Sequence, residues 1–239
     1  MTRSIIVILI FCCFASAYGQ TQPVSVRVFL NEQQGLLEID RFALGQGGLS
    51  EEPMWDNRVA EIRALRPKII RLFIQEYFNL LPERDQYYFE TLDRSVETIL
   101  KTGAKPLMCI CFKPKVLFPI VNQDVVEPND YQQWEKLIFN LVRHYKERGA
   151  GIRYWEVSNE PDIGEDGGCP YRFKPDSYCK YYKHTAAAIL RADPNALVGG
   201  PALANPRSSI LPALLGLCSK EDIPLQKLHF LFFKHRNGL

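Results

Sequence analysis

Apolar and polar positions along this chain follow two different periods. Short apolar runs that end at Gly, Pro or polar clusters predict strands, and apolar residues three and four positions apart predict helices. After a mixed, strand-bearing segment at residues 24–40, strand-like and helix-like segments follow one another in turn. The predicted strands cover residues 42–45, 68–73, 106–112, 152–158, 197–200 and 228–233, and the predicted helices cover 54–65, 85–102, 131–148, 176–191 and 208–218.

This alternation is typical of parallel βα units, so the expected fold class is α/β, of the (β/α)8 TIM-barrel type. A closed eight-stranded barrel needs about 250 residues. Six strands fit before Leu239, which predicts an incomplete barrel with about six of the eight units. An open doubly wound sheet is the alternative, but Gly45-Gln46-Gly47-Gly48 lacks the third glycine of a dinucleotide-binding loop. No change in composition divides residues 20–239, so we expect one domain.

The first 19 residues have the features of an export signal. Met1-Thr2-Arg3 gives a positive start, an apolar stretch runs from Ile5 to Phe14, and Ala15-Ser16-Ala17 has the small-x-small pattern of a cleavage site. We therefore predict a signal peptide over residues 1–19, cleaved after Ala17 or Gly19, and a secreted or periplasmic protein. A membrane anchor is the alternative, but the apolar run is shorter than the about 20 residues that cross a bilayer.

Charge and cysteine content narrow the function classes. The net charge is +2, from 29 basic and 27 acidic residues, and the basic residues are scattered, which implies no nucleic-acid or membrane partner. The five cysteines beyond the signal peptide show no Cys-x-x-Cys pair, so neither zinc nor any other cofactor is implied. Cys109 and Cys111 are expected to be buried on a strand, and Cys169 and Cys179 are the best candidates for a disulfide in an oxidising compartment.

The most informative segment runs from Tyr154 to Asp162, where an apolar strand stops at Asn159-Glu160-Pro161. In a parallel barrel, catalytic residues lie at the carboxyl ends of the strands. A polar turn ended by a proline is the alternative interpretation of the same residues. A glutamate at this edge suits glycoside hydrolysis, which needs one protonated and one ionised carboxyl group, and the neighbouring amide can donate to a sugar hydroxyl.

Trp155 to Gly164, together with the predicted helix that follows, resembles glycoside hydrolase family 39. That family includes β-xylosidases and α-L-iduronidases, and belongs to a clan of retaining glycosidases built on (β/α)8 barrels. The resemblance is strongest over residues 152–201. It implies that Glu160 is the general acid/base and that Asn159 binds the 2-hydroxyl group of the substrate. Arg71, placed at the end of the predicted second strand, matches the arginine that the clan carries there and is a candidate substrate-binding residue, with a structural salt bridge as the alternative.

Other parts of the resemblance are weaker. His235, in a segment that only approximates the family's sixth strand end, is a candidate substrate contact. In the loop that follows the motif, Tyr171 and Phe173 either line a sugar subsite or anchor the loop. The family's nucleophile is a glutamate at the end of strand seven, beyond the six predicted strands. The hypothesis that follows is that these 239 residues alone have little or no hydrolytic activity, as a truncated form of a longer enzyme.

Two other functions compete with the glycosidase. One is a noncatalytic carbohydrate-binding protein that keeps the barrel mouth and lacks hydrolysis. The other is a different hydrolase, but the chain has no Gly-x-Ser-x-Gly elbow and its four histidines lack the His-Glu-x-x-His spacing. The expected partner is a carbohydrate substrate.

Overall fold

The computed structural model describes residues 27, 44–46, 51–120, 122–167, 169–221 and 223. The predicted signal peptide and the predicted strand at residues 228–233, with His235 after it, lie outside the described residues.

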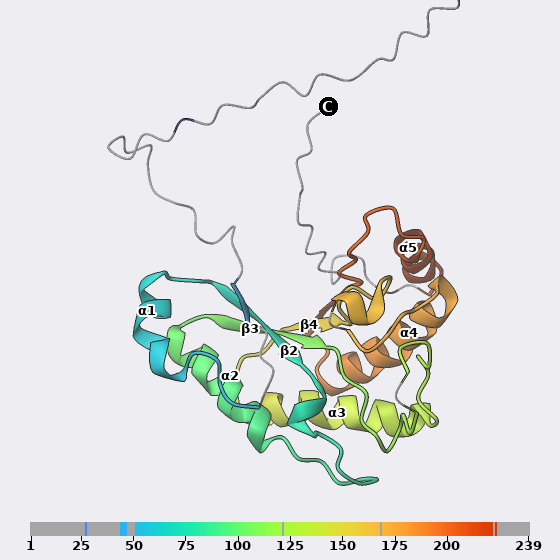
Figure 1. The fold of residues 1–239 in the computed structure, drawn as a ribbon. Coiled ribbons are helices and arrows are strands. Elements are labelled where there is room, and N and C mark those ends of the chain that lie inside the picture. Colours follow the sequence, from blue (N-terminus) through green and yellow to red (C-terminus); the bar gives the residue numbers. More distant parts are fainter. Residues whose placement is uncertain are drawn as a thin grey trace, which may run out of the picture. The chain divides into compact units, whose positions relative to one another are not determined.

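A parallel sheet organises the described part of the chain (Figure 1). Its five strands stand side by side in the order of the sequence, β1-β2-β3-β4-β5. A doubly wound sheet would reverse its strand order part-way, whereas this order advances in one direction, as in a barrel. The strands are β1 (Leu44–Gln46), β2 (Ile69–Ile74), β3 (Lys105–Ile110), β4 (Tyr154–Val157) and β5 (Leu197–Gly199).

Helices connect the strands, and Figure 1 shows α1 to α4 following one another along one side of the sheet. Local signals set their ends. The Asp130 side chain accepts hydrogen bonds from the backbone N–H groups of Gln132 and Gln133 and so caps α3. Gly103, at φ 89°, ends α2 in the left-handed conformation that favours glycine. The helices are α1 (Val59–Ala64), α2 (Glu90–Thr102), α3 (Tyr131–Glu147), α4 (Pro175–Ala192) and α5 (Ile210–Lys220), with short 3-10 turns η2 (Asp56–Arg58), η3 (Glu76–Phe78) and η4 (Gly164–Gly167).

The predicted elements agree with these bounds to within about two residues except at the starts of α1 and α2. The helix predicted from Met54 is the 3-10 turn η2 followed by α1, which begins at Val59. The sequence predicts a helix from Asp85, but α2 begins at Glu90. Asp85 has a φ of 60°, and Glu83 and Gln86 form an isolated antiparallel bridge. A turn with a left-handed residue cannot continue as a right-handed helix, so the apolar residues of this stretch belong to a turn and not to the helix.

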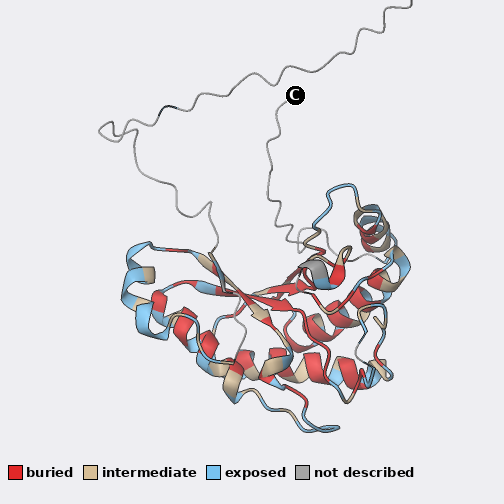
Figure 2. Ribbon diagram, viewed as in Figure 1, coloured by how far each residue is buried: buried red, intermediate tan, exposed pale blue. Residues whose placement is uncertain are grey.

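Burial along β2 distinguishes the two faces of the sheet. Ile70, Leu72 and Ile74 are buried against the helices, whereas Arg71 and Phe73 on the opposite face are half-buried. Figure 2 shows the buried residues, in red, concentrated along the strands and on the helix faces that meet them. The face that carries Arg71 is the one that turns inward in a barrel, and the functional candidates lie on it.

No helix among the described residues is both long enough and apolar enough to pass through a bilayer.

Candidate active site

A buried ion pair lies on the inward face of the sheet. Arg71, the third residue of β2, donates from Nε to Oε2 of Glu156 on β4 over 2.6 Å, and its Nη2 also contacts that oxygen. The pair is well shielded, since the side chain of Arg71 is 14% exposed and that of Glu156 only 4%. Burial acts to lower the pKa of the Arg71 guanidinium, but Cys109 and the Glu156 carboxylate outweigh it, and the net pKa is raised. Arg71 is therefore held as a cation in the middle of the sheet.

The same guanidinium fixes the amide of Asn159. Arg71 Nη2 donates to Asn159 Oδ1 over 2.8 Å, and Asn159 is only 8% exposed. A guanidinium has donors and no acceptor, so the amide must present its oxygen to Arg71. The amide nitrogen of the same side chain is a donor, the kind of group that can bind a sugar hydroxyl. Glu156, Arg71 and Asn159 form a chain of contacts that ends at the motif.

The backbone of the motif is bent where Glu160 leaves the strand. Ser158 and Glu160 have φ angles of 72° and 43°, a left-handed region that costs a non-glycine residue roughly 1–3 kcal/mol. Hydrogen bonds hold this conformation. Glu160 N–H donates to the carbonyl of Ala202 over 2.9 Å, and the Glu160 carbonyl accepts from Ile163 N–H at 3.1 Å and Gly164 N–H at 3.2 Å. Strained backbone of this kind gathers at functional sites, and here it lies at the motif that carries Glu160.

Asp162 ties the loop after β4 to the loop after β5. Its two carboxylate oxygens accept from the backbone N–H groups of Ala204 at 3.1 Å and Asn205 at 2.9 Å. This contact and the bond from Glu160 to Ala202 support the motif from the neighbouring loop. Neither contact was foreseen from the sequence, because both partners lie about 40 positions further along the chain.

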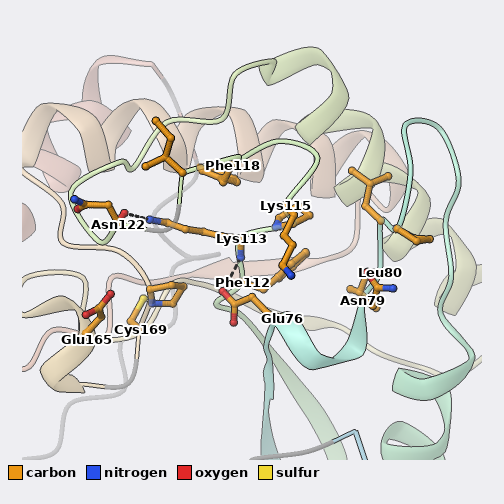
Figure 3. Close-up of a pocket in the computed structure, with 15 residues that line it drawn as sticks. Glu76, Asn79, Leu80, Phe112, Lys113, Lys115, Phe118, Asn122, Glu165 and Cys169 are labelled. Carbon is orange, nitrogen blue, oxygen red and sulfur yellow. Dashed lines mark hydrogen bonds between the residues drawn. The ribbon is translucent and has the colours of Figure 1, made fainter.

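Beside the motif lies a cavity of about 700 Å³, shown in Figure 3. Its walls come from the loops that follow β2, β3 and β4, so it opens at the carboxyl edge of the sheet. Lys113 crosses it: its backbone N–H donates to Glu76 Oε1 at 2.9 Å and its ammonium group to the Asn122 carbonyl at 2.7 Å (Figure 3). Burial raises the pKa of Glu76 and lowers that of Lys113. Phe112, Phe118 and Leu80 add apolar surface, a mixture that suits an amphipathic ligand such as a sugar ring with its aglycone.

Asn159 and Glu160 do not line this cavity, but one wall residue connects it to them. Cys169 Sγ lies 3.3 Å from Ser158 Oγ, next to Asn159 in the chain. Burial acts to raise the pKa of the Cys169 thiol, but hydrogen bonds from Cys111, Ser158 and the backbone outweigh it and bring the pKa down to about 7. Because the proton transfer of glycoside hydrolysis needs a carboxyl group and Glu160 belongs to the motif, the motif is the candidate reacting centre and the cavity is the adjacent binding space.

The predicted disulfide between Cys169 and Cys179 is wrong. All five described cysteines are free thiols, and Cys169 interacts with Cys111 and Ser158 instead. Cys179 lies within α4, whereas Cys169 is buried in the loop after β4. The prediction that Cys109 and Cys111 are buried is confirmed, and both side chains are fully enclosed.

Alkylation of the unfolded protein without reductant, followed by peptide mapping, is expected to label both Cys169 and Cys179. A peptide pair joined through these two cysteines would contradict the structure. The Cys218 peptide serves as the internal control, because this residue is also a thiol in the structure.

The structure brings most of the predicted site residues together. Arg71, Asn159 and Glu160 belong to one site. Arg71 lies inside β2 and not at its end, and from there it contacts Glu156 and Asn159. The expected salt bridge is therefore present, and a contact of Arg71 with substrate stays a prediction. His235 lies outside the described residues, and its role is likewise a prediction.

Tyr171 and Phe173 anchor the loop. Both side chains are buried, at 0% and 5% exposure, and Tyr171 Oη donates to the Phe112 carbonyl. Buried rings of this kind cannot stack on a sugar in solution. Within the described residues, no group of three or more His, Cys, Asp or Glu side chains is arranged to hold a metal ion.

Comparison with known proteins agrees with this geometry. A family profile described as Glycosyl hydrolases family 39 matches residues 62–235. The chain belongs to this family. A β-xylosidase of Geobacillus stearothermophilus is 31% identical over 153 residues, which cover 58% of this chain and 29% of that protein. A β-xylosidase of Caldicellulosiruptor saccharolyticus is 30% identical over 149 residues, covering 58% of this chain and 30% of that protein. The chain thus spans about a third of the length of these curated relatives.

Solved structures of family 39 share the fold. The family 39 enzyme of Xanthomonas axonopodis pv. citri matches with a TM-score of 0.63 and 24% identity, over 77% of this chain and 40% of that one. A monomeric β-xylosidase of Caulobacter crescentus CB15 matches with a TM-score of 0.62 and 24% identity over the same shares. The barrel-type fold expected from the βα alternation is confirmed, and the described strands form part of such a barrel.

Proposed function

We propose that this family 39 protein is a retaining glycosidase in which Glu160 is the general acid/base. The observation that carries the proposal is the juxtaposition of Glu160 with Asn159, whose amide is oriented by the buried Arg71–Glu156 pair. Asn159 and Glu160 come directly after β4, at the edge of the sheet where catalytic residues of parallel barrels lie.

In the first step, Glu160 gives its proton to the glycosidic oxygen while a second carboxylate attacks the anomeric carbon. The C–O bond to the leaving group breaks, and a glycosyl ester forms. In the second step, the ionised Glu160 takes a proton from water, which displaces the ester and returns the second carboxylate. The resemblance to the family assigns the second carboxylate to strand seven, and the described strands end at β5.

Asn159 is proposed to hold the 2-hydroxyl group of the sugar. Hydrogen bonds to this hydroxyl strengthen as the ring approaches the oxocarbenium-like transition state. A donor held in place by neighbours acts without having to reorganise during the reaction, and Arg71 supplies that constraint.

The relatives suggest which substrates to test first. Two curated relatives are β-xylosidases, and a third, 25% identical over 142 residues, is β-galactosidase BbgII of Bifidobacterium bifidum. We therefore propose a sugar substrate linked through an O-glycosidic bond, with β-xylosides as the first of a panel of aryl glycosides. Hydrolysis is to be measured on the protein as its own organism makes it, with variants introduced at the native gene, because the nucleophile is assigned to a later strand.

Asn159→Ala is expected to lower kcat/KM about 100-fold on the preferred glycoside, since a hydrogen bond to a substrate hydroxyl in a preorganised site contributes about 2–3 kcal/mol. The 2-deoxy analogue of that glycoside serves as the matched control. Because it lacks the hydroxyl, wild type and variant should act on it within about fivefold of each other. Equal losses on both substrates would contradict the assignment.

Saturable sugar binding without turnover in every form of the protein would favour the noncatalytic carbohydrate-binding protein instead.

We further propose that the protein is secreted or periplasmic, on the basis of residues 1–19. N-terminal sequencing of the exported protein is expected to begin at Tyr18 or Gln20. A mature protein that retains Met1 would contradict the predicted signal peptide.

A further inference from the structure

Three buried thiols meet next to the motif. Cys109 lies in β3, Cys111 directly follows that strand, and Cys169 lies in the loop after β4, with side chains that are 0%, 0% and 1% exposed. Hydrogen bonds join Cys109 to Cys111 and Cys111 to Cys169. We call these three residues the thiol cluster. The proposed glycosidase mechanism uses none of them.

The thiol cluster contacts the catalytic site at both of its ends. At one end, Arg71 Nη2 donates to Cys109 Sγ at 3.3 Å, and Cys109 Sγ donates to the Ser158 carbonyl at 3.4 Å. At the other end, Cys169 Sγ lies 3.3 Å from Ser158 Oγ and accepts a hydrogen bond from the backbone N–H of Asn159. A chemical change at these sulfurs therefore acts on the groups that hold the motif in place.

One member of the thiol cluster lines a cavity. Cys169 belongs to the wall of the cavity of about 700 Å³ at the carboxyl edge of the sheet (Figure 3), whereas Cys109 and Cys111 do not line it. Because the Cys169 side chain is only 1% exposed, the cavity gives access to a reagent of about the size of water and not to a bulky one.

Cys169 is also the most acidic of the described thiols. Burial acts against this, but hydrogen bonds from Cys111, Ser158 and the backbone hold its pKa at about 7. The pKa is raised in each of the other four described cysteines, by burial in three of them and by hydrogen bonding in Cys111. The thiolate is the nucleophilic form of cysteine, and at pH 7 it makes up about half of Cys169 and roughly 1% or less of the others.

We propose that Cys169 is a site of oxidation by hydrogen peroxide and that Cys111 is its resolving thiol. The Cys169 thiolate attacks one oxygen of the peroxide, so that an S–O bond forms, the O–O bond breaks, and hydroxide leaves and takes up a proton to become water. The sulfur is oxidised to a sulfenic acid and the peroxide is reduced. The Cys111 thiol then attacks this sulfur, an S–S bond forms, and the hydroxyl group leaves with the Cys111 proton as water.

The disulfide changes what the motif rests on. Its formation draws the Cys169 sulfur toward the end of β3 and removes the negative charge of the thiolate, so Ser158 Oγ and the Asn159 N–H lose this acceptor. We expect peroxide to lower glycoside hydrolysis about tenfold or more, since a small displacement of catalytic groups is costly, and a thiol reductant to restore it. This consequence rests on the proposed glycosidase function.

The test is peptide mapping of the natively produced protein after brief exposure to hydrogen peroxide. A peptide pair joined through Cys111 and Cys169 is expected, and dithiothreitol should separate it. In Cys111→Ser no thiol resolves the sulfenic acid, so dimedone should label Cys169. Oxidation of Cys169 should be about tenfold or more faster than that of the half-buried Cys179, although Cys179 is the more exposed of the two.

Cys179→Ser is the matched control, because it removes a thiol outside the thiol cluster. It should leave the joined peptide pair and the response of hydrolysis to peroxide unchanged, whereas Cys169→Ser should abolish both. Thermal melts verify that each variant is folded. Oxidation of Cys179 ahead of Cys169 would overturn the proposal. Dimedone labelling of wild-type Cys169 with no joined pair would contradict the role of Cys111.

Peptide mapping needs no hydrolysis, so this inference and the proposed function can fail separately. A protein that forms the disulfide but cleaves no glycoside would support the oxidation site and contradict the glycosidase. Undiminished hydrolysis by protein that carries the disulfide would contradict the link between the thiol cluster and the motif.

Discussion

Replacing Glu160 by Gln is expected to lower kcat/KM on phenyl glycosides about 1000-fold, because general acid catalysis contributes typically 10²–10⁴-fold. Glutamine keeps the size and polarity of the side chain but has no proton to give to the leaving oxygen. The backbone of the motif should be unaffected, since Glu160 is held through its N–H and carbonyl groups. The measurement is steady-state hydrolysis by the natively produced protein.

A matched control makes this result specific. Glu165→Gln removes a carboxylate from the wall of the adjacent cavity without touching the motif, and it should retain activity within a few-fold. Full activity in Glu160→Gln would exclude this residue as the proton donor.

Replacing Arg71 by Ala is expected to destabilise the protein by about 3–5 kcal/mol, because removing one partner of a buried pair leaves the other charge without compensation. The side chain of Glu156 is 4% exposed and would lose the cation that neutralises it. Asn159 would lose the donor that orients its amide, so activity should fall further than stability alone explains. Urea unfolding measures the first effect and kinetics well below the unfolding transition measures the second.

The double variant Arg71→Met/Glu156→Gln is the control for the buried charge. It removes both charges, so it should recover a large part of the lost stability while activity stays low. If Arg71→Ala costs no more than an exposed arginine such as Arg58, whose ion pair with Glu61 is a surface one, the pair does not hold the site together. Similar stability of the single and double variants would lead to the same conclusion.

The sequence predicted the fold well because its signals are local. Apolar runs of a few residues and helical spacing are read within a short window, and the helix starting at Asp85 failed where a local turn competed with that spacing. The consecutive strand order also follows from parallel βα units, which advance in one direction in a barrel.

The candidate site was predicted only in part. Asn159 and Glu160 stand together in the chain, so their pattern is visible, but the contacts that position them are long-range. Arg71 is 88 positions from Asn159, and the sequence does not mark Glu156 as the residue that neutralises Arg71. The cysteines failed for the same reason: Cys169 was paired with a cysteine near in sequence, whereas the fold brings it to Cys111.

The role of Glu160 as proton donor is tested most directly by comparing two leaving groups. The ratio of kcat/KM between wild type and Glu160→Gln is measured on the phenyl glycoside and on the 2,4-dinitrophenyl glycoside of the same sugar. Dinitrophenolate leaves without protonation, so the ratio should fall from about 1000 on the phenyl glycoside to less than about 10 on the activated one. The same large ratio on both substrates would contradict the account. An activated leaving group compensates only for a lost proton donor, so an equal loss on both substrates would mean that Glu160 acts in some other way.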